Sequence, residues 1–169
     1  MQFIYCPKCG EKLTTKEAGD DGLVPFCVPC NRYYFDIFPS CVIVLVANEF
    51  DEVVLLRQSY LSDKYHTFVA GYMCVGETAE NAAVREVKEE IGLDVDELSY
   101  AGTYWFGQKE LLMIGFIARV KKAEFKLSSE VDRAHWANLE AVPELIFPKS
   151  TENAAYYIYE KFKKLIRNE

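Results

Sequence analysis

The stretch that decides the fold runs from Gly71 to Leu93 and reads G-Y-M-C-V-G-E-T-A-E-N-A-A-V-R-E-V-K-E-E-I-G-L. Glu86, Glu89 and Glu90 fall at positions i, i+3 and i+4, so a helix would carry all three carboxylates on one face, here called the glutamate face. Carboxylates this close repel one another, and a hard cation such as Mg²⁺ or Mn²⁺ would reverse that repulsion. The pattern therefore indicates metal-assisted phosphate chemistry, although the bare string R-E-x-x-E-E is also typical of a solvated acidic face.

The same stretch contains the signals that begin and end a helix. Thr78 is suited to cap a helix that we predict over Ala79–Ile91, and Gly92 stands where a left-handed glycine would end it. Arg85 is placed to pair with Glu89 one turn later. An apolar stripe with a spacing of four is expected opposite the glutamate face: Ala83, Val87 and Ile91.

The fixed residues of this stretch match the Nudix box: Gly71, Glu77, Arg85-Glu86, Glu89-Glu90 and Gly92-Leu93. The chain thus resembles the Nudix hydrolases, which cleave diphosphate bonds with the help of divalent metal ions. The resemblance implies an α+β fold, an α/β/α sandwich built on a mixed sheet. It assigns catalytic roles to Arg85 and to the glutamate face, Glu86, Glu89 and Glu90. It also implies Mg²⁺ or Mn²⁺ held by these glutamates and by the main-chain carbonyl of Ala70 or Gly71.

Composition limits the other classes of protein. The 169 residues suffice for one core of about 100–150 residues and a small appendage. No apolar run approaches the roughly 20 residues of a membrane span, and no signal peptide is visible, so no membrane partner and a cytoplasmic location are expected. The net charge of −7 disfavours nonspecific binding to the nucleic-acid backbone.

Four of the six cysteines form two C-x-x-C pairs, Cys6/Cys9 and Cys27/Cys30, within residues 1–38. Without a secretion signal, this pattern favours a metal over disulfides, and four thiolates suit a closed structural Zn²⁺ site. We predict that residues 1–38 form a zinc ribbon, with a rubredoxin-like iron site as the alternative. Catalytic zinc is disfavoured because four cysteines leave no open position. Cys41 and Cys74 are expected to be small buried side chains.

Residues 39–169 are predicted to form the Nudix hydrolase domain, because strand-like and helix-like segments alternate there. The aromatic segment 32–38 is strand-like and links it to the ribbon. A C-terminal helix is expected to begin at Ser150 or Thr151, with an apolar stripe at Ala155, Ile158, Phe162, Leu165 and Ile166. The other predicted elements are strands over 41–47, 53–57, 67–70, 100–106, 111–120 and 132–137, and a short helix over 141–145.

A four-cysteine ribbon directly before a Nudix domain resembles the NADH pyrophosphatase branch, which also cleaves NAD⁺ and removes NAD caps from RNA. The branch is marked by S-Q-P-W-P-F-P-x-S, where residues 102–110 here read G-T-Y-W-F-G-Q-K-E. The aromatic pair Trp105-Phe106 survives, but the prolines and serines do not. The resemblance implies hydrolysis of NADH or NAD⁺ to nicotinamide mononucleotide and AMP. ADP-ribose or another nucleoside diphosphate-sugar is the alternative substrate, and NAD-capped RNA is a further expected partner.

Matching this branch position by position adds further site residues. Glu130, in the string E-V-D-R-A-H-W, corresponds to an additional metal ligand. Glu89 is the expected general base, with Glu110 and Glu130 as rivals. The expected substrate contacts are Phe35, Tyr104, Trp105, Phe106 and Glu110. For the aromatic residues, packing within the protein is the alternative.

Three further expectations remain open at this level. His66 and His135, the only histidines, are expected to be surface or strand residues rather than a general base. A non-catalytic Nudix module that binds a nucleotide or RNA is the alternative from another functional class. A homodimer is expected from the resemblance alone.

Overall fold

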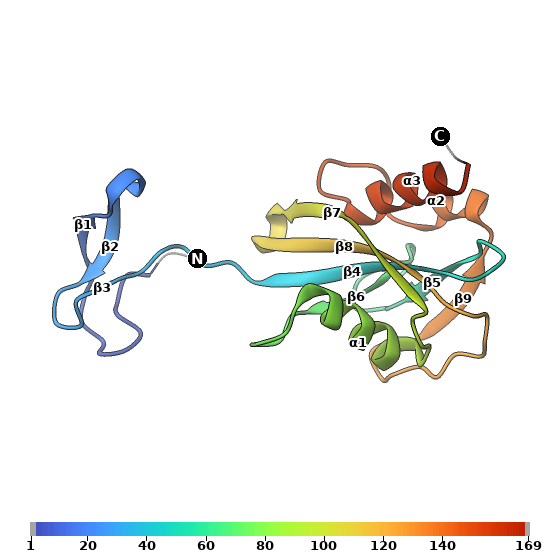
Figure 1. The fold of residues 1–169 in the computed structure, drawn as a ribbon, viewed down its shortest axis with the longest axis horizontal. Coiled ribbons are helices and arrows are strands. Elements are labelled where there is room, and N and C mark those ends of the chain that lie inside the picture. Colours follow the sequence, from blue (N-terminus) through green and yellow to red (C-terminus); the bar gives the residue numbers. More distant parts are fainter. Residues whose placement is uncertain (1–2, 168–169) are drawn as a thin grey trace. The chain divides into compact units, whose positions relative to one another are not determined.

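The computed structural model describes residues 3–167, and the chain divides into two compact units, Met1–Phe38 and Pro39–Glu169 (Figure 1). The first unit is a three-stranded antiparallel sheet in the order β1-β2-β3, formed by β1 (Thr14–Glu17), β2 (Leu23–Cys27) and β3 (Arg32–Tyr33). The strand-like segment predicted over 32–38 is therefore wrong beyond Tyr33. Tyr34 N–H still donates to the Pro25 carbonyl at 2.8 Å, but Pro25 has no N–H to return, which ends the ladder.

The second unit contains a six-stranded mixed sheet. Its main path is β7-β8-β4-β5-β9, and β6 pairs with β4 outside that path. β4 and β8 are parallel, from Ser40 opposite Leu112 to Ala47 opposite Arg119, and the other pairs are antiparallel. The strand bounds are β4 Ser40–Ala47, β5 Val53–Arg57, β6 Val69–Tyr72, β7 Glu97–Phe106, β8 Leu111–Arg119 and β9 Arg133–Ala137.

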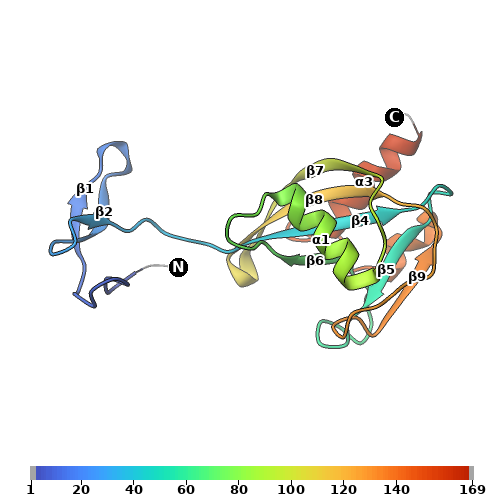
Figure 2. The ribbon, with the colours of Figure 1, turned by 60° about the horizontal axis from the view of Figure 1, so that its bottom comes forward.

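Helices cover both faces of this sheet, as Figures 1 and 2 show. The helix α1 (Ala79–Ile91) lies on one face, and α2 (Val142–Leu145) and α3 (Ala154–Arg167) lie on the other. β4 is buried on both sides, because alternate side chains point to opposite faces. Ile43 and Leu45 join the core beneath α3, whereas Val44 joins the core beneath α1. The predicted α/β/α sandwich with a mixed sheet is confirmed.

The helix α1 has the bounds predicted from its capping residues. Thr78 Oγ1 accepts a hydrogen bond from Asn81 N–H at 3.3 Å, and Gly92 has a φ of 75° in the left-handed region. The predicted stripe of Ala83, Val87 and Ile91 is fully buried against the sheet. The helix therefore begins and ends at the positions that its capping residues predict. Because the apolar stripe is buried against the sheet, the glutamates lie on the remaining part of the helix surface.

Several local predictions are wrong. β6 begins at Val69 rather than at residue 67, so Gly71 lies within the strand. α3 begins at Ala154 rather than after Ser150 or Thr151, because Asn153 Oδ1 accepts from Tyr156 N–H at 3.2 Å. Leu165, expected in the buried stripe of α3, is exposed. Cys74, expected to be buried, is also exposed, whereas Cys41 is buried as predicted. No helix within residues 3–167 is long and apolar enough to cross a membrane.

Candidate active site

The helix α1 places its three glutamates in different surroundings. Glu86 and Glu90 are buried, with 9% and 3% of their surface exposed, whereas the Glu89 side chain is 58% exposed. Glu86 and Glu90 are one turn apart, so their carboxylates lie one above the other on the same side of the helix. Two carboxylates buried side by side are unfavourable without a compensating cation or proton.

Gly71 in β6 makes room for the Glu86 carboxylate. A Cβ atom on residue 71 would lie 2.0 Å from the carboxyl carbon of Glu86 and 2.0 Å from its Oε1. The φ of Gly71 is not in the left-handed region, so the absence of a side chain is required here by space rather than by backbone conformation. The strand backbone and the Glu86 carboxylate are thus in direct contact.

Arg85 orders the glutamates around it, because all five of its N–H groups donate hydrogen bonds. Nε and Nη2 form a two-point ion pair with Glu77 at 2.8 and 2.9 Å, and Nη2 also donates to the Tyr72 carbonyl at 3.1 Å. Nη1 donates to Glu86 Oε1 at 2.7 Å and to Glu89 Oε2 at 2.9 Å. Arg85 also lowers the pKa of Glu77 to about 2, with a smaller contribution from the Cys74 N–H. The predicted pairing of Arg85 with Glu89 is confirmed.

Glu90 has the most strongly perturbed carboxyl group of the three. Burial, and then the charge of Glu86, raise its pKa to about 8, with a smaller contribution from Glu130. The Ala70 N–H and the side chain of Gln58 oppose this rise by hydrogen bonding to the carboxylate. Glu90 Oε2 is nevertheless buried without a hydrogen-bond partner among residues 3–167. An unpaired buried carboxylate oxygen beside a second buried carboxylate is a donor set that fits a divalent cation.

The glutamates do not form a tight cluster as the structure stands. Among the described residues, the four cysteines of the first unit are the one group of three or more metal-ligating atoms that all lie within 4.8 Å of one another. Arg85 pairs with both Glu86 and Glu89, which holds these carboxylates in their present positions. Cation binding would therefore require small rearrangements of side chains on the glutamate face.

Two loops flank the C-terminal part of α1. Gln58 and Tyr60 lie in the loop after β5, and Glu130 lies in the loop before β9, where its charge acts on both Glu90 and Tyr60. The loops are joined at Asp132, whose Oδ2 accepts from Ser59 N–H at 2.6 Å. The sequence predicted Glu130 as a site residue, and the structure brings it near Glu90. The sequence analysis did not predict Gln58 or Tyr60 as site residues, because neither belongs to a motif or has a characteristic spacing.

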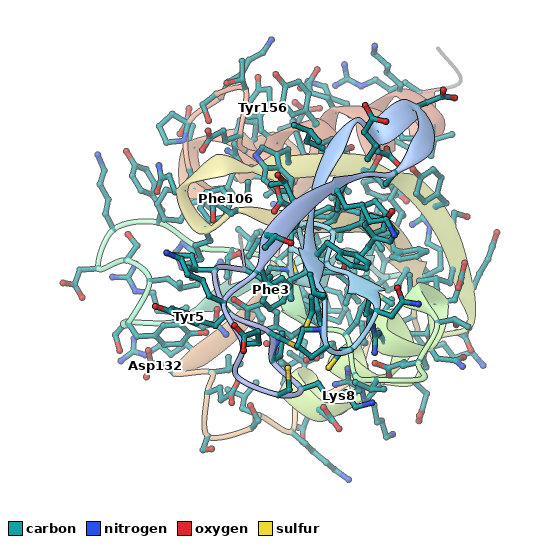
Figure 3. The ribbon with its side chains drawn as sticks, turned by 90° about the vertical axis from the view of Figure 1, so that its left-hand side faces the viewer. Phe3, Tyr5, Lys8, Phe106, Asp132 and Tyr156 are labelled. Atoms are coloured by element: carbon teal, nitrogen blue, oxygen red, sulfur yellow. The ribbon has the colours of Figure 1, made fainter. Side chains whose placement is uncertain are left out.

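The predicted substrate contacts are not all brought together. Tyr104 stacks on Tyr157 with ring centroids 6.0 Å apart and donates to the Ala101 carbonyl, so its ring packs within the protein. Trp105 is about half exposed. Phe106, which is labelled in Figure 3, lies at the end of β7 and is partly buried. Glu110 is exposed after a short 3₁₀ turn, with a left-handed φ of 48°. Phe35 belongs to the first unit, outside the unit that carries the glutamates.

The first unit brings the four predicted cysteine ligands together. The sulfurs of Cys6 and Cys30 are 3.9 Å apart, and those of Cys9 and Cys27 are 3.5 Å apart. A tetrahedron of sulfurs at about 2.3 Å from a zinc ion has edges of about 3.8 Å, so the group fits the metal. Burial alone would raise the pKa of Cys6, but the Tyr34 hydroxyl at 3.0 Å and the N–H groups of Cys9 and Lys8 lower it to about 6.

Comparison with known proteins agrees with this geometry. The model of the NUDIX domain family matches residues 38–162, which include the whole sheet and the glutamate face. The chain therefore belongs to the Nudix family. A crystal structure of a NUDIX hydrolase from Nitrosomonas europaea superposes with a TM-score of 0.75 and 18% sequence identity, covering 99% of this chain and 94% of that one. At this identity, the likeness supports the fold.

The chain is also similar in sequence to curated proteins. The NAD-capped RNA hydrolase NudC of Pseudomonas aeruginosa is 32% identical over 142 residues, which cover 83% of this chain and 50% of that protein. NudC of Pseudomonas fluorescens (strain Pf-5) is 30% identical over 156 residues, with 91% and 54% covered. The chain thus spans about half the length of the curated relatives it matches.

Proposed function

We propose that the chain is a metal-dependent pyrophosphohydrolase that cleaves the diphosphate bond of a nucleoside diphosphate-X substrate. The observation that carries the proposal is the pair of buried carboxylates, Glu86 and Glu90. Glu86 packs against Gly71, and one oxygen of Glu90 has no hydrogen-bond partner among residues 3–167. A protein without a cation to bind would gain stability from apolar side chains at these positions. The buried carboxylates therefore favour a catalytic role over a non-catalytic module.

The burial and the hydrogen bonds of each residue suit it to a different role in the proposed reaction. Glu86, Glu90, Glu130 and the main-chain carbonyl of Ala70 or Gly71 would hold Mg²⁺ or Mn²⁺. When bound, the cation supplies charge neutralisation for the diphosphate oxygens and a bound water of lowered pKa. Glu89 is the most accessible carboxylate of the glutamate face, and it would take the proton from the attacking water. Arg85 orients Glu89 and Glu86 through its Nη1 group and so acts as a positioning residue.

We propose NADH or NAD⁺ as the substrate, cleaved to nicotinamide mononucleotide and AMP. The support is the similarity to proteins named NAD-capped RNA hydrolases, together with the ribbon that precedes the Nudix domain. Trp105, which is about half exposed on β7, would stack on a nucleobase. ADP-ribose is the competing substrate, because residues 102–110 lack the prolines and serines of the NADH-cleaving branch.

We also propose that residues 1–38 are a zinc ribbon and residues 39–169 the catalytic domain. A unit this small buries little apolar surface, so the metal would supply much of its folding free energy. Metal analysis of the purified protein should find one zinc per chain, and Cys9→Ser should lower that content. A coloured protein containing iron instead would support the rubredoxin-like alternative.

The first experiment is product analysis with Mg²⁺ or Mn²⁺, in which NADH, NAD⁺ and ADP-ribose are offered side by side. Glu89→Gln should lower kcat by about 100-fold or more, because general-base catalysis typically contributes that much. The matched control is Glu80→Gln, which removes an exposed carboxylate from the first turn of the same helix and should keep the kcat of the parent protein.

Each outcome of that experiment has a distinct meaning. Release of nicotinamide mononucleotide from NADH would support the proposed substrate, and preference for ADP-ribose would replace it. If none of the three is cleaved, other nucleoside diphosphate-X compounds are tested next. If no such compound is cleaved, the proposal of an enzyme is refuted, and a non-catalytic binding module is favoured. An unchanged kcat in Glu89→Gln would remove Glu89 from the chemistry.

A further inference from the structure

A second cluster of charged side chains lies at the edge of the sheet formed by β5 and β9 and extends into the loops next to them. There, an open cavity of about 740 Å³, here called the basic cavity, is lined mainly by polar and charged side chains. These side chains are Arg57, Ser59, His66, Asp132, Arg133 and His135. None of them carries out a step of the proposed hydrolysis.

The two arginines of the basic cavity stand opposite one another. Arg57 pairs with Arg133 in the antiparallel register of β5 and β9. Like charges directly opposite across two strands destabilise the sheet. Within residues 3–167, no carboxylate lies within 4.0 Å of either guanidinium group. The pairing of these like charges is therefore unfavourable unless negative charge lies nearby, and Asp132, which interacts electrostatically with both arginines, supplies one such charge.

Asp132 is the one acidic group among the residues that line the cavity, and its single negative charge offsets only part of the positive charge of the two arginines. Its Oδ2 already accepts a hydrogen bond from Ser59 N–H at 2.6 Å. Figure 3 labels Asp132. One carboxylate faces two guanidinium groups in a chain whose net charge is −7. A local excess of positive charge in an acidic protein indicates a binding site for an anion.

The two histidines add hydrogen-bonding capacity to the cavity. The rings of His66 and His135 meet edge to face with centroids 5.0 Å apart. His66 Nδ1 is buried and has no hydrogen-bond partner among the described residues. His66 therefore lines the same cavity as Arg57 and Arg133 with one ring nitrogen unsatisfied, and an imidazole N–H at the cavity wall could donate to an oxygen-rich ligand.

We propose that the basic cavity binds a phosphate group, at a site distinct from the glutamate face. Guanidinium groups fit phosphate oxygens with two parallel hydrogen bonds, and a phosphate between Arg57 and Arg133 would relieve their repulsion. The phosphate has two possible sources, a free phosphate anion or a phosphodiester of a nucleic-acid chain. Binding here involves no bond cleavage, so the proposal stands whether or not the chain is a pyrophosphohydrolase.

The histidines provide a direct readout, because the chain contains only two and both line the basic cavity. The untagged, zinc-loaded chain of 169 residues would be titrated with inorganic phosphate, and separately with a short RNA that has hydroxyl groups at both ends. Imidazole signals would be followed by NMR at constant pH and ionic strength. A saturable shift with inorganic phosphate identifies a free anion as a ligand. A saturable shift with the RNA alone identifies the phosphodiester.

Variants then test whether the arginines carry the binding. Arg57→Gln combined with Arg133→Gln should weaken binding at least about tenfold, since both charge-assisted pairs are lost. If the double variant folds poorly, Arg133→Gln alone is used to test phosphate binding, because Arg133 is exposed and its replacement should not disturb folding. Arg167→Gln at the end of α3 is the matched control and should bind like the parent protein. Absence of a saturable shift with both probes, or an unchanged shift in the arginine variants, would overturn the proposal.

Discussion

Replacement of Gly71 by Ala should separate catalysis from folding. The new Cβ atom would lie 2.0 Å from the Glu86 carboxyl carbon, whereas carbon atoms in contact are about 3.5 Å apart. The carboxylate must therefore move by about 1.5 Å, away from the Arg85 Nη1 that now donates to it at 2.7 Å. It is the end of a flexible side chain, so we expect the protein to stay folded. A displacement of this size at a reacting group costs about 100-fold in rate, or about 2.7 kcal/mol.

The assay compares kcat for diphosphate cleavage with urea unfolding of the same preparations. Glu80→Gln is the control, because it changes an exposed side chain in the first turn of the same helix and leaves the glutamate face untouched. A double-mutant cycle tests the cause, since Gly71→Ala should have little further effect on kcat once Glu86 is Ala. A normal kcat in Gly71→Ala, or an undiminished loss on top of Glu86→Ala, would refute the reasoning.

Three further predictions concern single side chains. In Arg85→Gln, the pKa of Glu77 should rise from about 2 toward its ordinary value, which NMR titration would detect. In the parent protein, Glu77 stabilises the folded state above about pH 4.5, and this contribution is lost as pH falls toward 2. In Arg85→Gln, the free energy of unfolding should no longer show this pH dependence. Folded protein without divalent ions should hold a proton on Glu90 between pH 4.5 and about 8, so the free energy of unfolding should fall as pH rises across that range, by up to about 5 kcal/mol. Glu90→Gln should flatten this pH profile, and an equally steep profile would contradict the assignment. Asn153→Ala should lower the unfolding free energy by about 1 kcal/mol, measured by urea unfolding, because it removes the cap of α3.

The parts of the fold that were predictable are those whose signals lie in neighbouring residues. The bounds of α1 follow from Thr78 and Gly92, which act within one turn of the helix ends. The start of α3 was missed because Ser150, Thr151 and Asn153 are all acceptable caps. The choice depends on tertiary contacts, since Asn153 Nδ2 donates to the Phe147 and Pro148 carbonyls and so fixes the preceding loop.

The candidate site was predictable to the same extent. The glutamate face follows from helical spacing alone, but the buried amide of Gln58 depends on the packing of a loop against α1. Arg57 and Arg133 are 76 residues apart in the chain and meet only through the register of β5 and β9. Sequence spacing carries no information on that register, because a one-residue slip would send either side chain to the other face.

The five hydrogen bonds of Arg85 limit which changes of length this region can accept. Each residue of a helix turns the chain by about 100°, so one residue inserted between Ala79 and Arg85 would rotate the guanidinium away from Glu77. Lysine offers three donors from a single nitrogen and could not replace the planar group. The number of residues between Glu77 and Arg85 therefore cannot change without loss of the ion pair between them. Loop grafting in this protein should be confined to segments outside this interval.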